Sequence, residues 1–279
     1  MSKVNTKTTA LHHLVLKFFF TLKQVIKSQR SSKNPIIKIP ISMLYLIRNS
    51  FRYSLHIFID ADYRSSILVE LLNSRDVHQT TSLTFMNRYP VIFSACQNYF
   101  KEKKDLRILS YGCSTGEEIL TLRSYFPSAN IVGAEINKRS LKICRKRTVD
   151  EKISFIYSTL SEIQKNEPYD VIFSMAVLQR KPHVIAAKGI TSLKNIYPFE
   201  KFEETIIEFD KLITPGGLLV VHYTQYSLLD TDVAQKYQAL GNYNQNDYKE
   251  PVFDKNSNLI AKNKAIIAFR SLRFYTIFF

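Results

Sequence analysis

The residues best suited to chemistry lie in a glycine loop between an apolar, strand-like run and a helical pattern. The run Leu106–Tyr111 ends in the string Gly112-Cys113-Ser114-Thr115-Gly116, and Glu117 and Glu118 follow at once. A strand, a glycine turn and a helix in this order bring bare backbone close to a nucleotide-like ligand. The first turn of a helix usually attracts anions, so two glutamates there would repel a phosphate. The loop therefore predicts an adenosine-bearing ligand with cationic groups in place of phosphates.

The same loop resembles a known family. The string Gly112-Cys113-Ser114-Thr115-Gly116-Glu117-Glu118 is similar to the nucleotide loop of the chemotaxis-receptor (CheR) methyltransferases. More broadly it resembles motif I of the class I S-adenosylmethionine-dependent methyltransferases, and the resemblance covers roughly residues 85–270. It implies S-adenosyl-L-methionine, a sulfonium with an amino group, as the cofactor. It also implies methyl transfer to an acceptor that stays unidentified, either a small molecule or a protein carboxylate.

A second acidic residue supports the nucleotide site. Glu135 ends the next apolar run, 23 residues after Gly112, where a carboxylate can accept hydrogen bonds from both ribose hydroxyls. The resemblance implies that the third and fourth strands end beside the adenine and the methionine moiety. The cofactor-binding residues expected in this way are Gly112, Cys113, Ser114, Gly116, Glu117, Glu135, Ile136, Thr159, Leu160, Ser174 and Met175. For Thr159 and its neighbours, a helix cap is the competing interpretation.

Two histidines are candidates for a catalytic base. His183 follows the fourth expected strand and His222 ends the fifth, and ligands bind beyond the carboxyl ends of such strands. An imidazole there could take a proton from an oxygen or nitrogen acceptor. Displacement at a sulfonium depends chiefly on alignment, however, and a base matters only when the acceptor must lose a proton. The sequence leaves the catalytic residue open.

Alternating strand-like and helical patterns must position these residues. Strands are expected at 106–111, 130–135, 153–157, 169–175 and 218–223, with a last strand near 264–269. Helices are expected at 117–126, 138–147 and 199–213, a turn at 214–217 and a polar loop at 243–263. Ser114 with Glu117, or Thr115 with Glu118, would form a capping box at the first helix. The alternation predicts an α/β fold with a Rossmann-like, doubly wound, mostly parallel sheet, which is the class I methyltransferase fold.

The first part of the chain is basic and helical. Residues 1–58 hold seven Lys, three Arg and no acidic residue, so they carry +10 of the net charge of +15. Residues 11–27 have amphipathic spacing but fall short of the roughly 18–20 apolar residues that span a membrane. Further helices are expected at 41–59, 63–73 and 90–103. We expect a basic helical N-terminal extension at 1–84 and an S-adenosylmethionine-binding methyltransferase domain at 85–279.

The basic leader predicts an anionic partner or a solvated tail. Residues 11–27 fit either a helix packed on the catalytic domain or a peripheral anchor on an anionic membrane. Nucleic acid is disfavoured because the chain lacks a basic platform interleaved with aromatic residues. The cysteines Cys96, Cys113 and Cys144 form no C-x-x-C pair, which argues against a zinc site and for a reducing compartment. We expect a cytoplasmic protein without a metal, peripheral to a membrane if residues 11–27 bind one.

Two other functions remain open from the sequence. An NAD-dependent enzyme also needs a glycine turn and an acid about 20 residues later, but Gly112-x-x-x-Gly116 lacks the G-x-G-x-x-G spacing. A non-catalytic Rossmann-fold binding protein would use its basic N-terminus to contact membrane or nucleic acid. The +10 leader favours this alternative. So does Met175-Ala176, which stands where chemotaxis methyltransferases carry an Arg-Asn pair.

Overall fold

The computed structural model describes residues 34–240, 250–262 and 268–271, together with Lys17, Thr21 and Gln24. It divides into two compact units, Met1–Arg64 and Ser65–Phe279. The predicted amphipathic segment 11–27 lies outside the described residues, apart from those three positions. Among the described residues, no helix has the length and hydropathy needed to cross a membrane.

The first unit contains one long described helix, α2 (Pro35–Ile59). Asn34 caps it by accepting the backbone N–H of Ile36, and Pro35 occupies the first turn, where a missing N–H leaves no hydrogen bond unmade. The helix begins earlier than the predicted 41–59, so Pro40 lies inside it. α3 (Ala61–Leu72) follows and contains the point at which the two units divide.

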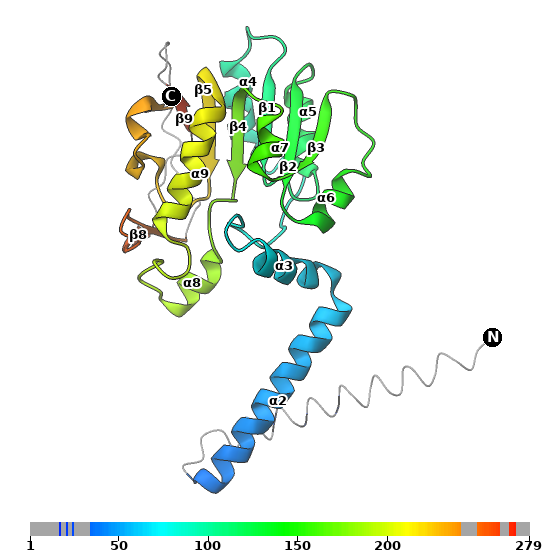
Figure 1. The fold of residues 1–279 in the computed structure, drawn as a ribbon, viewed down its shortest axis with the longest axis vertical. Coiled ribbons are helices and arrows are strands. Elements are labelled where there is room, and N and C mark those ends of the chain that lie inside the picture. The colour runs from blue at the N-terminus through cyan, green and yellow to red at the C-terminus, as the bar shows by residue number, and fades with distance from the viewer. Residues whose placement is uncertain are drawn as a thin grey trace, which may run out of the picture. The chain divides into compact units, whose positions relative to one another are not determined.

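The second unit is built on a seven-stranded sheet in the order β3-β2-β1-β4-β5-β9-β6 (Figure 1). Its five parallel strands are β1 (Arg107–Tyr111), β2 (Asn130–Glu135), β3 (Ile153–Tyr157), β4 (Tyr169–Met175) and β5 (Ile213–His222). β9 (Ala268–Ser271) runs antiparallel between β5 and β6 (Tyr237–Ala239). The predicted α/β fold, Rossmann-like and mostly parallel, is confirmed. Strand order reverses between β1 and β4, which is where open sheets of this kind bind ligands.

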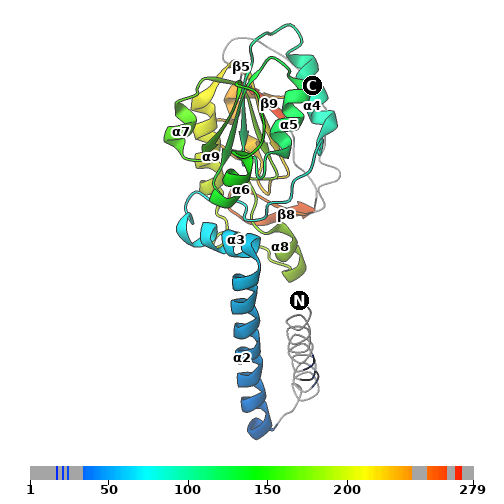
Figure 2. The ribbon, with the colours of Figure 1, turned by 90° about the vertical axis from the view of Figure 1, so that its right-hand side faces the viewer.

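Helices cover both faces of this sheet. They are α4 (Pro90–Tyr99), α5 (Glu117–Tyr125), α6 (Lys138–Cys144), α7 (Leu160–Gln164), α8 (Pro182–Lys188) and α9 (Phe199–Leu212), with short 3-10 turns at Leu228–Asp230 and Ala234–Lys236. Figure 2 shows α4 and α5 on one side and α7 and α9 on the other. Successive side chains of a strand point to opposite faces. Ile108 therefore joins the core under α4 and α5, and Leu109 joins the core under α9.

Two segments differ from the sequence predictions. Residues 214–217, predicted as a turn, belong to β5 as a bulge: Tyr169 pairs with Ile213, but Val171 pairs with Leu218. The predicted loop 243–263 contains an antiparallel pair, β7 (Pro251–Phe253) and β8 (Leu259–Lys262). Strands this short show too few alternating residues to be recognised from sequence.

The boundary between the two units also lies before the predicted one, which separated 1–84 from 85–279. Residues 65–84 belong to the second unit and make contacts with its strands and helices. Ser65 Oγ donates to Asn137 Oδ1 at 2.6 Å, and Asn73 Nδ2 donates to the Tyr157 hydroxyl at 3.0 Å. Val77 is fully buried.

Candidate active site

A cavity of about 260 Å³ opens in the second unit where the strand order reverses. Its floor comes from the loops that follow β1, β2, β3 and β4. Of the residues predicted to bind the cofactor, six line it: Gly112, Cys113, Ser114, Glu135, Ile136 and Met175. The carboxyl ends of neighbouring parallel strands meet at one edge of a sheet, which is why residues distant in sequence converge here.

The glycine loop exposes its backbone to this cavity. Gly112 has φ +79°, a left-handed conformation, and its N–H donates to the Ala134 carbonyl oxygen at 2.8 Å. A Cβ on Gly112 would lie only 2.5 Å from Val177 Cγ2. Glycine is therefore required at this position both by backbone conformation and by space.

Glu135 lies beside the glycine loop, and each of its two carboxylate oxygens accepts a backbone N–H group. Oε2 accepts the Ser114 N–H at 2.7 Å, and Oε1 accepts the Asn137 N–H at 2.6 Å. Burial raises the pKa of Glu135 to about 7, against the lowering effect of these backbone hydrogen bonds. Each oxygen of a carboxylate has a second lone pair, so Glu135 can accept two further hydroxyl groups from the cavity.

The two glutamates that begin α5 have different surroundings. Glu118 lines the cavity and accepts the Ser110 hydroxyl at 2.7 Å, and burial raises its pKa to about 7. Glu117 is not among the lining residues. Its carboxylate forms an ion pair with Arg147 and accepts the Thr115 hydroxyl at 2.6 Å. Of the two glutamates predicted to favour a cationic ligand, Glu118 lines the cavity and Glu117 pairs with Arg147. Contact of Glu117 with the donor stays a prediction.

The predicted capping box at α5 is wrong. The helix is capped by Gly116 at φ +93°, without a side-chain hydrogen bond. Ser114 has φ +53°, and its backbone N–H is directed to Glu135 instead. The loop is supported from behind by Arg147 Nε, which donates to the Thr115 carbonyl oxygen at 2.6 Å. The start of α5 is therefore set by the backbone conformation of the loop and has no side-chain cap.

The remaining predicted cofactor residues do not line the cavity. Thr159 caps α7 by accepting the Glu162 N–H at 3.4 Å, and Leu160 is exposed at the first position of that helix. Ser174 is buried within β4. The adenine subsite expected from the sequence at Ser158, Thr159 and Leu160 stays a prediction, and Ser158 is the one of these three residues that lines the cavity.

The two candidate bases, His183 and His222, have different surroundings. His183 lies at the cavity rim, where its Nδ1 is 2.7 Å from Glu250 Oε1 and its side chain is 88% exposed. His222 is buried at the end of β5, stacked on Tyr223 with ring centroids 4.0 Å apart, and is not among the lining residues. The His222 ring also packs edge-on against Tyr89, a cavity residue, with ring centroids 5.1 Å apart. A catalytic role for either histidine stays a prediction.

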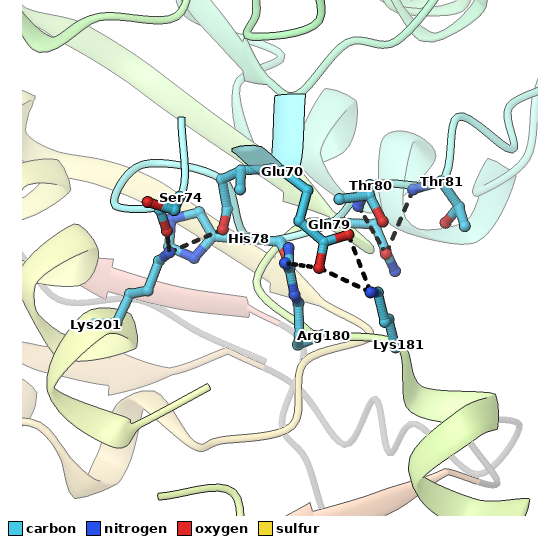
Figure 3. A network of polar contacts seen from close by, with 10 residues as sticks. Glu70, Ser74, His78, Gln79, Thr80, Thr81, Arg180, Lys181 and Lys201 are labelled. Atoms are coloured by element: carbon cyan, nitrogen blue, oxygen red, sulfur yellow. Dashed lines mark hydrogen bonds and ion pairs between the residues drawn. The ribbon is translucent and has the colours of Figure 1, made fainter. Parts of the chain in front are cut away.

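Sequence reasoning missed the segment that forms the other wall. Residues 76–89, here called the strap, contribute most of the lining opposite the glycine loop. Figure 3 shows how the strap and the end of α3 are held: Lys201 Nζ donates to the carbonyl oxygens of Ser74 and Val77 at 2.7 and 2.9 Å. Glu70 pairs with Arg180 at 2.9 Å and with Lys181 at 2.8 Å. No local motif marks this segment, because its partners come from α9 and the loop after β4.

His78 of the strap is a structural residue despite its place in the cavity lining. Its ring nitrogens lie 2.8 Å from the Tyr197 hydroxyl and 3.1 Å from Thr205 Oγ1. Burial, with the nearby charges of Lys201 and Arg180, lowers the pKa of His78 to about 3. The imidazole is therefore neutral at physiological pH and joins the strap to α9.

Comparison with known proteins assigns the fold to a family. Residues 102–266, more than half of the chain, match the family model described as a methyltransferase domain. The chain belongs to this methyltransferase family. The methyltransferase uses S-adenosylmethionine as its methyl donor, as the glycine loop predicted. This finding favours the enzyme over the NAD-dependent and non-catalytic alternatives.

Individual relatives of the methyltransferase are distant. It is 28% identical over 82 residues to a malonyl-[acyl-carrier protein] O-methyltransferase of Priestia megaterium, covering 29% of each chain. A protein of the same name from Bacillus anthracis is 27% identical over 88 residues, which cover 32% of this chain and 33% of the relative. The chain thus spans about a third of the length of these curated relatives. The crystal structure of the plantazolicin methyltransferase BpumL with a monoazolic desmethylPZN analog and SAH matches with a TM-score of 0.36, at 16% identity over 59% of this chain and 54% of that one.

The residues of the cavity fit the donor. Glu135 offers two carboxylate oxygens to ribose hydroxyls, and Gly112 leaves room where any side chain would strike Val177. Glu118 places a carboxylate in the cavity wall, where a positively charged ligand favours its ionised form. When bound, S-adenosylmethionine supplies an electrophilic methyl group. Gly112, Glu118 and Glu135 are the cavity residues that would hold and orient it.

The two buried carboxyl groups predict how stability depends on pH. The pKa values of Glu118 and Glu135 are raised from 4.5 to about 7, chiefly by burial. Between these values the folded chain binds more protons than the unfolded chain, so the free energy of unfolding should fall as pH rises from about 4.5 to 7. Denaturant unfolding across this range measures it. Glu118→Gln should make the fall shallower, and an unchanged pH dependence in that variant would contradict the assignment.

Proposed function

We propose that the methyltransferase methylates a carboxylate oxygen of its acceptor and forms a methyl ester. The observation that supports this is Arg88, a partly buried residue of the strap that lines the same cavity as Glu118. Its guanidinium lies 5.1 Å from the Tyr89 ring centroid and 5.6 Å from that of Phe85. The same cavity thus carries a carboxylate suited to a cationic donor and an arginine suited to an anionic acceptor, and the charge of Arg88 lowers the pKa of Glu118 against the raising effect of burial.

Contacts on the strap hold Arg88 in position. Its NH1 group donates to the Leu83 carbonyl oxygen at 2.7 Å, which anchors one side of the guanidinium. A guanidinium has five N–H donors in a planar fork, so the rest of the group can bind a carboxylate in the bidentate manner that lysine cannot reproduce. The Phe85 and Tyr89 rings lie within cation–π distance of it.

A carboxylate acceptor would also need no catalytic base. A carboxylic acid is ionised at neutral pH, so its oxygen is already a nucleophile and has no proton to lose. Alignment of that oxygen with the methyl group then provides most of the acceleration. The distant curated relatives point the same way, because a malonyl group attached to a carrier protein ends in a free carboxylate. The chemotaxis methyltransferases that the glycine loop resembles also methylate a carboxylate, that of glutamate.

Substitution of Arg88 tests this proposal. Arg88→Gln should raise the KM for a carboxylate acceptor by at least about tenfold, as expected when a hydrogen bond to a charged group is lost. The dissociation constant for S-adenosylmethionine, measured by calorimetry, should change little. Arg139→Gln, which removes an exposed arginine of α6, is the matched control.

The acceptor class itself is tested by following S-adenosylhomocysteine release with carboxylate, hydroxyl and amine acceptors. Free dicarboxylic acids and acidic polypeptides form separate arms, because the proposal covers both a small molecule and a protein carboxylate. Turnover of an amine or hydroxyl acceptor alone, insensitive to Arg88→Gln, would contradict the proposal.

A cytoplasmic location and a peripheral membrane contact through residues 11–27 stay separate proposals. The charge of the leader supports the membrane contact.

A further inference from the structure

α2 presents a stripe of large apolar side chains on the surface of the first unit. Ile36, Ile39, Met43 and Ile47 recur every three or four residues, and Phe58 lies about three turns further along the same face. Their side chains are 59–80% exposed, whereas Arg48, on another face of the helix, is 9% exposed. A helix in contact with water normally shows the opposite arrangement. The stripe therefore has the character of a binding surface.

The positive charge of α2 indicates which kind of partner binds the stripe. α2 itself contains no acidic residue and carries +3 from Lys38, Arg48 and Arg52. A second copy of the chain would bring the same positive charge against itself, whereas an anionic lipid surface attracts it. Arg52 and His56 lie outside the stripe on the same helix, and Tyr53 at its margin is 62% exposed. Apolar residues on one face, basic residues on another and an aromatic residue between them are typical of helices that lie in a membrane interface.

We propose that α2 lies in the surface of a membrane that contains anionic phospholipids, with the stripe Ile36, Ile39, Met43, Ile47 and Phe58 inserted among the acyl chains. This interaction is independent of the proposed acceptor. It is also distinct from the predicted contact through residues 11–27, because it rests on described side chains of α2. The apolar stripe supplies insertion, and the basic residues supply selectivity for anionic headgroups.

Vesicle sedimentation of the full chain tests the proposal. The protein should sediment with phosphatidylcholine vesicles that contain phosphatidylglycerol, and much less with phosphatidylcholine alone. The triple variant Ile39→Gln, Ile47→Gln, Phe58→Gln should reduce the partition coefficient at least about tenfold, because three inserted side chains lose their apolar area. Glutamine is a good helix former, so α2 should persist. The matched control is Ser42→Gln, Asn49→Gln, which changes two polar residues on another face of the same helix and should bind as the parent does.

Three outcomes would overturn the assignment. The first is equal sedimentation of the triple variant and the parent, and the second is no sedimentation of the parent with anionic vesicles. The third is a dimer, seen by analytical ultracentrifugation without lipid, that the triple variant abolishes, since this would assign the stripe to a second copy. A chain lacking residues 1–33 should still sediment if α2 binds the lipid. Unchanged affinity for S-adenosylmethionine, measured by calorimetry, shows that each variant remains folded.

Discussion

Replacing Gly112 by alanine should reduce the affinity of the methyltransferase for S-adenosylmethionine by at least about 100-fold. Overpacking costs about 1–3 kcal/mol, and a Cβ in the left-handed region a further 1–2 kcal/mol. Both apply here, because Gly112 has φ +79° and its Cβ would lie 2.5 Å from Val177 Cγ2. Val177 itself lines the cavity, so any movement that relieves the clash deforms the donor site. Calorimetric titration with S-adenosylmethionine measures the loss.

A second glycine provides a control that separates the cost of the steric clash from the cost of the left-handed backbone. Gly189, at the end of α8, also has a positive φ, +60°, but no atom lies within 4 Å of the position of its Cβ. Gly189→Ala should therefore destabilise the fold by about 1 kcal/mol and leave donor affinity unchanged. Adding Val177→Ala to Gly112→Ala should restore part of the affinity by removing the clashing methyl groups. Normal binding by Gly112→Ala would refute the role assigned to this loop.

Replacing Glu135 by alanine should weaken binding of S-adenosylmethionine by about 1–3 kcal/mol, or roughly 5- to 150-fold. The variant loses the acceptor for the ribose hydroxyls. It also leaves the backbone N–H groups of Ser114 and Asn137 without the carboxylate oxygens that now accept them at 2.7 and 2.6 Å. The measurement is again calorimetric, with the unfolding free energy recorded in parallel to separate affinity from stability.

Glu135→Gln tests whether the volume of this side chain or its capacity to accept hydrogen bonds determines donor affinity. Glu135→Gln keeps the volume but turns an NH₂ group toward one of the two backbone donors, so it should also bind the donor weakly. Glu117→Gln provides the comparison, because Glu117 pairs with Arg147 and is not among the cavity residues. It should lose much less affinity than Glu135→Gln. The reverse order would restore Glu117 as the residue that faces the donor and would displace Glu118 from that role.

The sequence by itself determined the framework of this site. Strands β1 to β4 and helices α5 and α6 follow local periodicity, and the glycine loop and Glu135 each stand at the end of a strand. Parallel strands place their carboxyl ends together, so local patterns were enough to predict that Gly112, Ser114 and Glu135 converge. The structure brings all three to one cavity.

Tertiary structure alone decided which of two adjacent glutamates lines the cavity and which segment outside the recognised motifs also lines it. Glu117 and Glu118 have the same chemistry and successive positions, and only the placement of Arg147, 30 residues away, neutralises one of them. The strap residues 76–89 lie outside every recognised motif and are held by Lys201 from α9. Contacts between residues distant in sequence leave no periodic signal in the chain, since they depend on how packed elements meet. For that reason the glycine loop could be found by reading along the sequence, and Arg88 of the strap could not.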